Sequence, residues 1–410
     1  MVHPASSRVG SSVLLRTHEA PAAKVRRTAP SDAVVAAVDP QGRLVCVAHL
    51  DSLQLFAAEE PLAPRALTPT GVVRSVCFSR CGGVLLSGGD DKAVRAWDVT
   101  ADAAAAPIGT WTHHKKIGCV AFAPLPAGGE TSLLGLWADK FGEVFAFDVR
   151  CPSAAPLLKL GHLSPVSHLA FTPGGGELVT ADREGHVRAS RWPSADIIER
   201  YYLTHTSPVE VVLPLAALPL LLTAAGSGAE VCLWRCDGAE RLWKRSAAEL
   251  LRLLRHAAPL GPDAGDAPPP APPPAPSPVA ASASAGSEAA EGSACGEGAV
   301  LRCACELAAS RLLYLGFDSE RTLHALEGAE AAEAELRPRP GLALELRSPP
   351  LALQSPVQGR LFALCEFELL CFALGEGGRL APSASFRLSE LPPPSVSSAA
   401  AADGDEEGEE

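Results

Sequence analysis

Ala138–Phe147 reads ADKFGEVFAF, and Ala181–Ser190 repeats the same form as ADREGHVRAS. In both stretches an Ala-Asp-basic turn joins an apolar strand to a strand with alternating side chains. The pattern also occurs at Gly88–Trp97 and at Ala225–Trp234. The last residues of the four units lie 50, 43 and 44 residues apart: Trp97, Phe147, Ser190 and Trp234. This period is close to that of a four-stranded propeller blade. The repeats therefore predict an all-β propeller.

Each unit is expected to open with a strand of period two. These first strands are predicted at Val73–Phe78, Ile117–Phe122, Val166–Phe171 and Val209–Leu213. A more continuously apolar strand such as Leu220–Leu222 follows, which is typical of strands buried on both faces by neighbouring blades. Val34–Ala58 resembles a weaker first unit, and Leu342–Leu346 is expected to begin the last one. We therefore predict seven blades.

A histidine stands four residues before the first strand in three units. These histidines are His113, His162 and His205. Gly161-His162 has the form that WD repeats use at this position, and Trp97-Asp98 keeps the dipeptide that ends such repeats. In WD repeats this histidine joins a hydrogen-bond network inside the blade. We therefore interpret one set of residues as structural: His162, Thr180, Asp182, Trp97 and Asp98. The predicted fold is a seven-bladed WD-repeat β-propeller.

Composition divides the chain further. We expect an N-terminal segment at 1–30 with a candidate ring-closing strand, blades 1–5 with a trailing helix-like segment at 31–256, a disordered Pro/Ala/Gly/Ser-rich insertion at 257–298, blades 6–7 at 299–391, and a disordered acidic tail at 392–410. The helix-like segment is Arg241–His256, which would cover a blade edge or bind a partner. Ten prolines fall between Pro259 and Pro278, and ordering some forty residues would cost roughly 40–80 kcal/mol of backbone entropy. An organelle transit peptide is the alternative for 1–30.

Composition and motifs also limit the function. The chain has 410 residues, 47% of them hydrophobic, a formal net charge of −12 and 12 scattered cysteines without a secretory signal, a usage typical of a reducing compartment. Pairs such as Cys232 and Cys236 lack the companion ligands of a zinc site, so no metal is expected. The longest apolar stretch, 211–225, is too short for a bilayer span. Because dinucleotide loops, phosphate loops and nucleophile elbows are all missing from the sequence, we expect no catalytic residues and a binding platform.

Charged residues gather in the repeated turns. Lys140 follows Asp139 in one unit, and Arg183 and Glu184 follow Asp182 in the next, with Arg188 just beyond. Equivalent turns of neighbouring blades should share one rim of the ring. A mixed-charge patch suits a protein partner better than nucleic acid, although scattered solvated charges are the simpler interpretation. An exposed ion pair contributes only about 0.2–1 kcal/mol, so binding would also need an apolar centre.

Over about residues 70–240 the sequence resembles one family within the WD repeats, the non-catalytic subunit of tRNA (guanine-N7-)-methyltransferase. The strings that carry the resemblance are Ala138–Val144 (ADKFGEV), Gly161–Ser164 (GHLS), Thr180–Arg183 (TADR), Ile198–Arg200 (IER) and His205-Thr206. The resemblance implies a subunit without an active site or cofactor of its own. It would form a heterodimer with a catalytic, Rossmann-type subunit that binds S-adenosylmethionine, and would meet tRNA through that complex, in the nucleus or also in the cytoplasm.

The resemblance also implies which residues contact the catalytic subunit. They are Lys140, Arg183, Glu184 and Arg188. Where the family often has a second acid and a lysine after Glu184, this chain has Gly185 and His186, so part of the ion-pair set differs. The alternative to this function is a generic WD-repeat scaffold, such as a substrate adaptor of a ubiquitin ligase, which needs only the blades.

Overall fold

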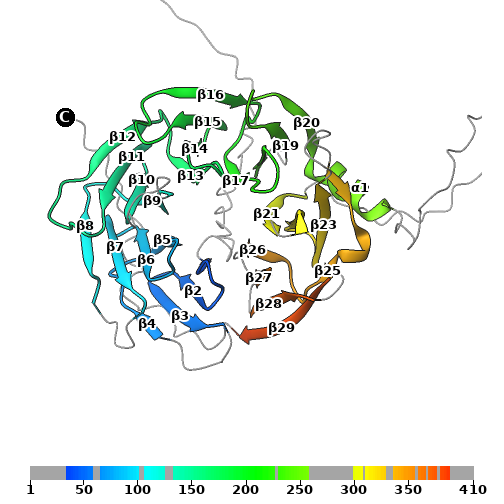
Figure 1. Ribbon diagram of the computed structural model, residues 1–410, viewed down its shortest axis with the longest axis horizontal. Coiled ribbons are helices and arrows are strands. Elements are labelled where there is room, and N and C mark those ends of the chain that lie inside the picture. Colours follow the sequence, from blue (N-terminus) through cyan, green and yellow to red (C-terminus); the bar gives the residue numbers. More distant parts are fainter. Residues whose placement is uncertain are drawn as a thin grey trace, which may run out of the picture.

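In the computed structural model, seven antiparallel sheets are arranged in a ring (Figure 1). The structure describes residues 34–58, 65–100, 106–124, 133–226, 230–257, 299–307, 310–328, 336–355, 359–365, 368–375 and 379–387. Neighbouring innermost strands meet all the way around, and the last of them, β26 (Pro350–Gln354), meets β1 (Val34–Val38). The predicted seven-bladed β-propeller is confirmed.

Each blade is a sheet of consecutive strands that runs from the axis outward. Blade 1 holds β1, β2 (Leu44–His49), β3 (Ser52–Ala57) and β4 (Arg65–Leu67). Blade 2 holds β5 (Val73–Phe78), β6 (Val84–Gly89), β7 (Ala93–Asp98) and β8 (Gly109–Thr112). Blade 3 holds β9 (Ile117–Phe122), β10 (Leu134–Asp139), β11 (Glu143–Asp148) and β12 (Leu157–Gly161). Blade 4 holds β13 (Val166–Phe171), β14 (Glu177–Asp182), β15 (His186–Arg191) and β16 (Ile198–Leu203).

The remaining three blades follow the same plan. Blade 5 holds β17 (Val209–Pro214), β18 (Leu220–Ala225), β19 (Glu230–Arg235) and β20 (Arg241–Ser246). Blade 6 holds β21 (Leu301–Leu307), β22 (Leu312–Phe317), β23 (Thr322–Gly328), β24 (Leu336–Pro338) and the short β25 (Leu344–Glu345). Blade 7 holds β26, β27 (Arg360–Cys365), β28 (Glu368–Leu374) and β29 (Leu380–Arg387). Within the described ranges, no helix is long and apolar enough to cross a membrane.

The core lies between the blades. The second strand of several blades, such as β6 and β18, is buried at every position, because neighbouring blades cover both of its faces. Each pair of neighbouring blades encloses an apolar cluster, and the one between blades 7 and 1 joins Phe362 and Leu364 to Val45 and Val47. These clusters account for the continuous apolar runs in the sequence.

A side chain helps to close the ring between blades 7 and 1. The Oε1 atom of Gln354 on β26 accepts a hydrogen bond from the backbone N–H of Val38 at 2.6 Å, and its Nε2 donates to the carbonyl oxygen of Ala36 at 3.1 Å. Gln354 thereby pairs with one backbone donor and one backbone acceptor of β1, as a neighbouring strand would. The ring-closing strand, the insertion at 257–298 and the acidic tail that the sequence predicts lie outside the described residues, apart from Ala257.

Two sequence-based expectations were wrong. Arg241–His256 is not one helix, because Arg241–Ser246 forms β20, the outer strand of blade 5. The helix α1 covers only Ala247–His256, and the Oγ of Ser246 caps it by accepting a hydrogen bond from the backbone N–H of Glu249 at 3.1 Å. Leu250, Leu251 and Leu254 of α1 then pack into the cluster between blades 5 and 6.

The second error concerns Leu342–Leu346, which does not begin blade 7. Leu344 lies in β25, which pairs with β23 and therefore belongs to blade 6. The first strand of blade 7 starts only at Pro350, the second residue of the Pro349-Pro350 pair. Proline limits the backbone and lacks an N–H, so it favours a break and is tolerated at the start of a strand.

Candidate functional site

The two repeated stretches form the same turn on neighbouring blades. In the β10–β11 turn, Asp139 Oδ1 accepts hydrogen bonds from the backbone N–H groups of Phe141 and Glu143 at 2.8 and 3.0 Å. In the β14–β15 turn, Asp182 Oδ1 accepts from Glu184 and His186 at 3.0 and 2.9 Å. The aspartate of each Ala-Asp-basic stretch is thus the residue that folds the turn.

The glycine in each turn is required by its backbone. Gly142 has φ +97° and Gly185 has φ +94°, in the left-handed region that favours glycine. A Cβ on Gly142 would lie 2.5 Å from the carbonyl oxygen of Ser164, and a Cβ on Gly185 would lie 2.5 Å from that of His205. Gly185 therefore has a structural reason to be glycine. Both turns pack against the loop that enters the next blade.

The structure brings His162, Thr180 and Asp182 together inside blade 4. His162 Nδ1 lies 3.1 Å from Asp182 Oδ2, and its Nε2 lies 2.7 Å from Thr180 Oγ1. Burial, together with the positive charge of nearby Arg188, lowers the pKa of His162 to about 4. The ring is therefore neutral at pH 7, so Nδ1 donates to the carboxylate and Nε2 accepts from the hydroxyl. Because both of its ring nitrogens are hydrogen-bonded, the buried imidazole of His162 fixes the loop that enters blade 4 to β14.

The other two residues of the predicted network, Trp97 and Asp98, lie in blade 2. Trp97 is fully buried and donates from Nε1 to the Oγ of Ser87 at 2.8 Å. Asp98 accepts hydrogen bonds from the backbone N–H and the hydroxyl of Thr100 at 2.9 and 2.6 Å. Blade 5 holds another partial network, in which Thr223 Oγ1 contacts the Nε2 of His205 and the Nε1 of Trp234, each at 2.8 Å. The network is thus distributed in pieces over several blades.

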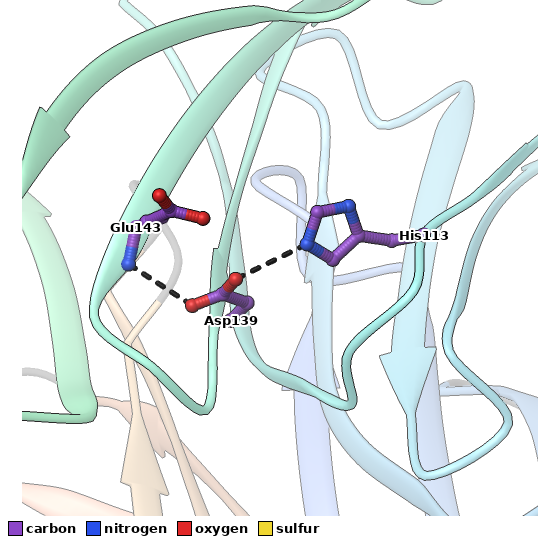
Figure 2. Close-up of side chains that lie close together, drawn as sticks. All are labelled: His113, Asp139 and Glu143. Carbon is purple, nitrogen blue, oxygen red and sulfur yellow. Dashed lines mark hydrogen bonds and ion pairs between the residues drawn. The ribbon is translucent and has the colours of Figure 1, made fainter. Parts of the chain in front are cut away.

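Blade 3 carries a histidine and two acids close together, as Figure 2 shows. The possible metal-ligand atoms of His113, Asp139 and Glu143 all lie within 4.8 Å of one another. His113 Nε2 lies 3.1 Å from Asp139 Oδ2, and the other oxygen of this buried carboxylate accepts the two backbone hydrogen bonds of the turn. Lys115 Nζ lies 3.9 Å from the carboxylate of Glu143. Because hydrogen bonds and a cation already engage these groups, the cluster is explained as the counterpart of the His162–Asp182 pair.

The four residues predicted to bind a partner do not form one cluster. Lys140 and Arg183 are both exposed, and both line a cavity at the rim where the two turns lie. Glu184 is exposed in its turn. Arg188 instead lies half-buried between blades, where its Nη2 donates to the carbonyl oxygen of Gly161 at 2.7 Å. The prediction from sequence thus grouped residues of the rim with Arg188, which lies between two blades.

Sequence reasoning missed a set of exposed apolar side chains beside these turns. Leu163 is fully exposed in the loop between β12 and β13, and Phe141 is 54% exposed, with Lys115 Nζ 3.7 Å from the centre of its ring. Tyr201 and Leu203 on β16 are 50% and 60% exposed, and they pair with Arg188 and His186 on β15. We call these four side chains, together with the half-buried Arg188 that pairs with Tyr201, the blade 3–4 patch: Phe141, Leu163, Arg188, Tyr201 and Leu203. A leucine directly after the Gly161-His162 pair was the one sequence signal that could have indicated it.

Comparison with protein families identifies two matches. A family model described as "tRNA methyltransferase TRM82 WD40 domain" matches residues 150–259, and "WD domain, G-beta repeat" matches residues 66–98. The first match starts before blade 4 and ends after α1, so it includes most of the blade 3–4 patch. The predicted resemblance is confirmed.

Curated relatives carry the same description. The "tRNA (guanine-N(7)-)-methyltransferase non-catalytic subunit" of Xenopus laevis is 34% identical over 143 residues, which cover 34% of this chain and 33% of the relative. That of Mus musculus is 37% identical over 117 residues (28% and 26%), and that of Dictyostelium discoideum is 28% identical over 184 residues (40% and 38%). The matching part of the chain thus spans about a third of the length of these relatives.

Solved structures resemble this chain in fold. The β-propeller domain of Myceliophthora thermophila Cps50 (Swd1) superposes with a TM-score of 0.56 at 11% identity, covering 82% of this chain and 92% of that one. A chain of the mitotic checkpoint complex gives a TM-score of 0.58 at 16% identity, covering 82% and 88%. At such low identity these likenesses establish the propeller architecture alone.

Proposed function

We propose that this chain is the non-catalytic subunit of a tRNA (guanine-N7-)-methyltransferase, which binds a separate catalytic subunit and supports formation of N7-methylguanosine in tRNA. The observation that carries the proposal is the family match over residues 150–259, because this segment contains Arg183, Glu184 and Arg188 and the exposed side chains beside them. The names of the relatives support this subunit, and they do not favour an adaptor of a ubiquitin ligase.

The blade 3–4 patch is the surface proposed to bind the catalytic subunit. Protein interfaces combine an apolar centre with a polar rim. Here Leu163, Tyr201 and Leu203 offer the apolar part, while Arg183 and Glu184 lie in the neighbouring turn. Fully burying one leucine side chain contributes roughly 1.5–3 kcal/mol, whereas an exposed ion pair contributes about 0.2–1 kcal/mol. The apolar residues should therefore supply most of the affinity, and the charges should select the partner and its orientation.

The proposed role of the propeller is to position its partner. In this proposal S-adenosylmethionine is bound by the catalytic subunit. A rigid platform holds that subunit in an arrangement that accepts tRNA, and misplacement by about 1 Å can cost on the order of 100-fold in rate. The net charge of −12 favours a phosphate-binding surface that is supplied mainly by the partner. The resemblance also suggests a nuclear location, which imaging of the tagged chain in its own cells would test.

The decisive experiment is co-expression of the chain with its candidate methyltransferase. A pull-down should recover both proteins, and methyl transfer to tRNA should be highest when both are present. Leu163→Asp should abolish recovery of the complex. Ile108→Asp is the matched control, because Ile108 is also an exposed apolar residue, 47% accessible, but precedes the outer strand of blade 2. A methyltransferase that neither binds nor gains activity would refute the proposal.

A further inference from the structure

A cavity of about 720 Å³ lies at the mouth of the central channel, on the rim that carries the two turns. Its walls include the innermost strands of blades 2 to 7. Five cationic side chains line it: Arg74, Lys116, Lys140, Arg183 and Arg302. They come from strands and turns up to 228 residues apart in the chain, so only the closed ring gathers them.

The cavity is positive in a chain that is otherwise acidic. Only two carboxylates line it, Asp90 and Glu210. Asp90 Oδ2 lies 2.7 Å from Arg74 Nη2 and 3.7 Å from Lys116 Nζ, and Glu210 lies 3.4 Å from Arg302. Five cations against two anions leave a local charge of +3, while the whole chain carries −12. A concave wall concentrates the field of such charges. The site therefore suits a ligand with several negative charges.

The chain leaves the described fold at this same rim. The last strand, β29, ends at Arg387, which pairs with Glu368 next to the β27–β28 turn. That turn is the blade 7 equivalent of the turns that hold Lys140 and Arg183. The sequence then continues to a segment with six acids in eight residues, 403–410.

The connection is long enough to reach the cavity. Fifteen residues separate Arg387 from Asp403, and an extended chain of this length spans up to about 50 Å. The outermost strand β29 and the innermost strand β26 of the same blade are three strand spacings apart, which is about 14 Å. The acidic segment can therefore cross the rim and enter the channel mouth.

We propose that the acidic segment 403–410 binds in this cavity as an intramolecular ligand. Attachment to the same chain through fifteen residues gives it a high effective concentration, on the order of millimolar. The six acids supply half of the net charge of −12, so their docking brings no further negative charge to the chain, whereas a nucleic acid would add its phosphates to it. A docked segment would cover Lys140 and Arg183 and so compete with the catalytic subunit. This consequence for partner binding rests on the proposed function, but the docking itself does not.

The test uses the full chain without any partner. One variant has the six acids replaced by their amides (Asp→Asn at 403 and 405, Glu→Gln at 406, 407, 409 and 410), which keeps the length. The probe is a fluorescein-labelled peptide of residues 399–410, and its anisotropy is followed at low and high salt. The amide variant should bind the peptide at least about fivefold more tightly than the natural chain, because its own segment no longer competes, and salt should weaken binding.

Cavity variants locate the binding site. In the amide background, Arg302→Gln and Lys116→Gln should each weaken peptide binding about threefold. Arg150→Gln is the matched control, because Arg150 is also paired with an acid, Asp148, but lies at the opposite rim. Equal peptide affinity of the natural chain and the amide variant would overturn the proposal. So would an equal loss with Arg150→Gln, or binding of a short RNA where the acidic peptide does not bind. These outcomes are independent of whether a methyltransferase binds the chain.

Discussion

Arg188 on blade 4 donates a hydrogen bond from Nη2 to the carbonyl oxygen of Gly161, the last residue of the outer strand of blade 3, at 2.7 Å. Burial lowers the pKa of the guanidinium, yet an arginine side chain stays charged at pH 7. The same charge disfavours protonation of His162. Arg188 therefore links blades 3 and 4 and helps to keep His162 neutral, in addition to any contact with a partner.

Replacing Arg188 by glutamine should destabilise the free chain. The change leaves the Gly161 carbonyl without its charged donor, so we expect the free energy of unfolding to fall by about 1–2 kcal/mol. Urea unfolding at pH 7 measures this loss. Arg191→Gln is the control, because Arg191 pairs with Glu199 at the surface with its side chain 58% exposed, and it should change stability by less than about 0.5 kcal/mol. Equal effects of the two variants would contradict the bridging role of Arg188.

Leu163→Asp should weaken binding of the catalytic subunit without changing the stability of the fold. Leu163 is fully exposed, so the substitution should leave the free energy of unfolding within about 0.5 kcal/mol of the natural value. The affinity of the variant for the catalytic subunit should fall at least about tenfold, because a charge would replace a leucine of the proposed interface. Titration calorimetry of the purified partners measures the affinity. Retained affinity would place the interface elsewhere.

Stability should decrease as pH falls from 7 to 5. Burial lowers the pKa of His162 and of His205 to about 4, below the ordinary value of 6.5. Both rings are neutral in the folded chain, so the unfolded chain binds more protons in this pH range. Lower pH therefore shifts the equilibrium toward the unfolded chain. Their contribution is complete above about pH 6.5 and is lost progressively as pH falls toward 4.

The expected loss between pH 7 and 5 is about 1–2 kcal/mol for each of these two buried histidines. Urea unfolding at both pH values measures it. His205→Gln should reduce the pH dependence, whereas Gly161→Ala, which adds a methyl group in open space, should leave it unchanged. A free energy of unfolding that stays level or rises toward pH 5 would be inconsistent with neutral buried rings.

The two kinds of glycine in blade 3 should respond differently to alanine. Gly142→Ala puts a Cβ at φ +97° and 2.5 Å from the Ser164 carbonyl oxygen, so we expect a loss of about 2 kcal/mol or more. Gly161→Ala meets no atom within 4 Å and should be nearly neutral, within about 0.5 kcal/mol. Thermal unfolding of the two variants compares them directly. Similar melting temperatures would show that the turn relaxes around the new methyl group.

Local sequence determined the blades well because each blade is built from neighbouring residues. The Asp139 and Asp182 turns use hydrogen bonds that reach only two to four residues along the chain, so a short repeated motif predicts them. By contrast, Leu242 and Trp243 fit a helical spacing, but pairing with β19 places them in a strand. Tertiary pairing overrode the local pattern there, and it also assigned Leu344 to blade 6.

The candidate surfaces were less accessible to sequence reasoning. Arg74 and Arg302 line one cavity because the ring closes between them, and no local pattern records that closure. Phe141 and Leu163 are exposed although their hydrophobicity suggests burial. The charged set was predicted from its turns, yet only the packing of blades 3 and 4 separates the bridging Arg188 from the rim residues Lys140 and Arg183.

Gln354 gives the ring a particular order of assembly. Among the described residues, every sheet is made of strands that follow one another in the chain, so each blade can form soon after it is synthesised. The bonds from Gln354 to Val38 and Ala36 join residues 316 and 318 positions apart. The first blade must therefore wait, with one face uncovered, until nearly the whole chain has left the ribosome. A chain stalled before Gln354 would expose Val45 and Val47, which makes this seam the place where a chaperone would be needed longest.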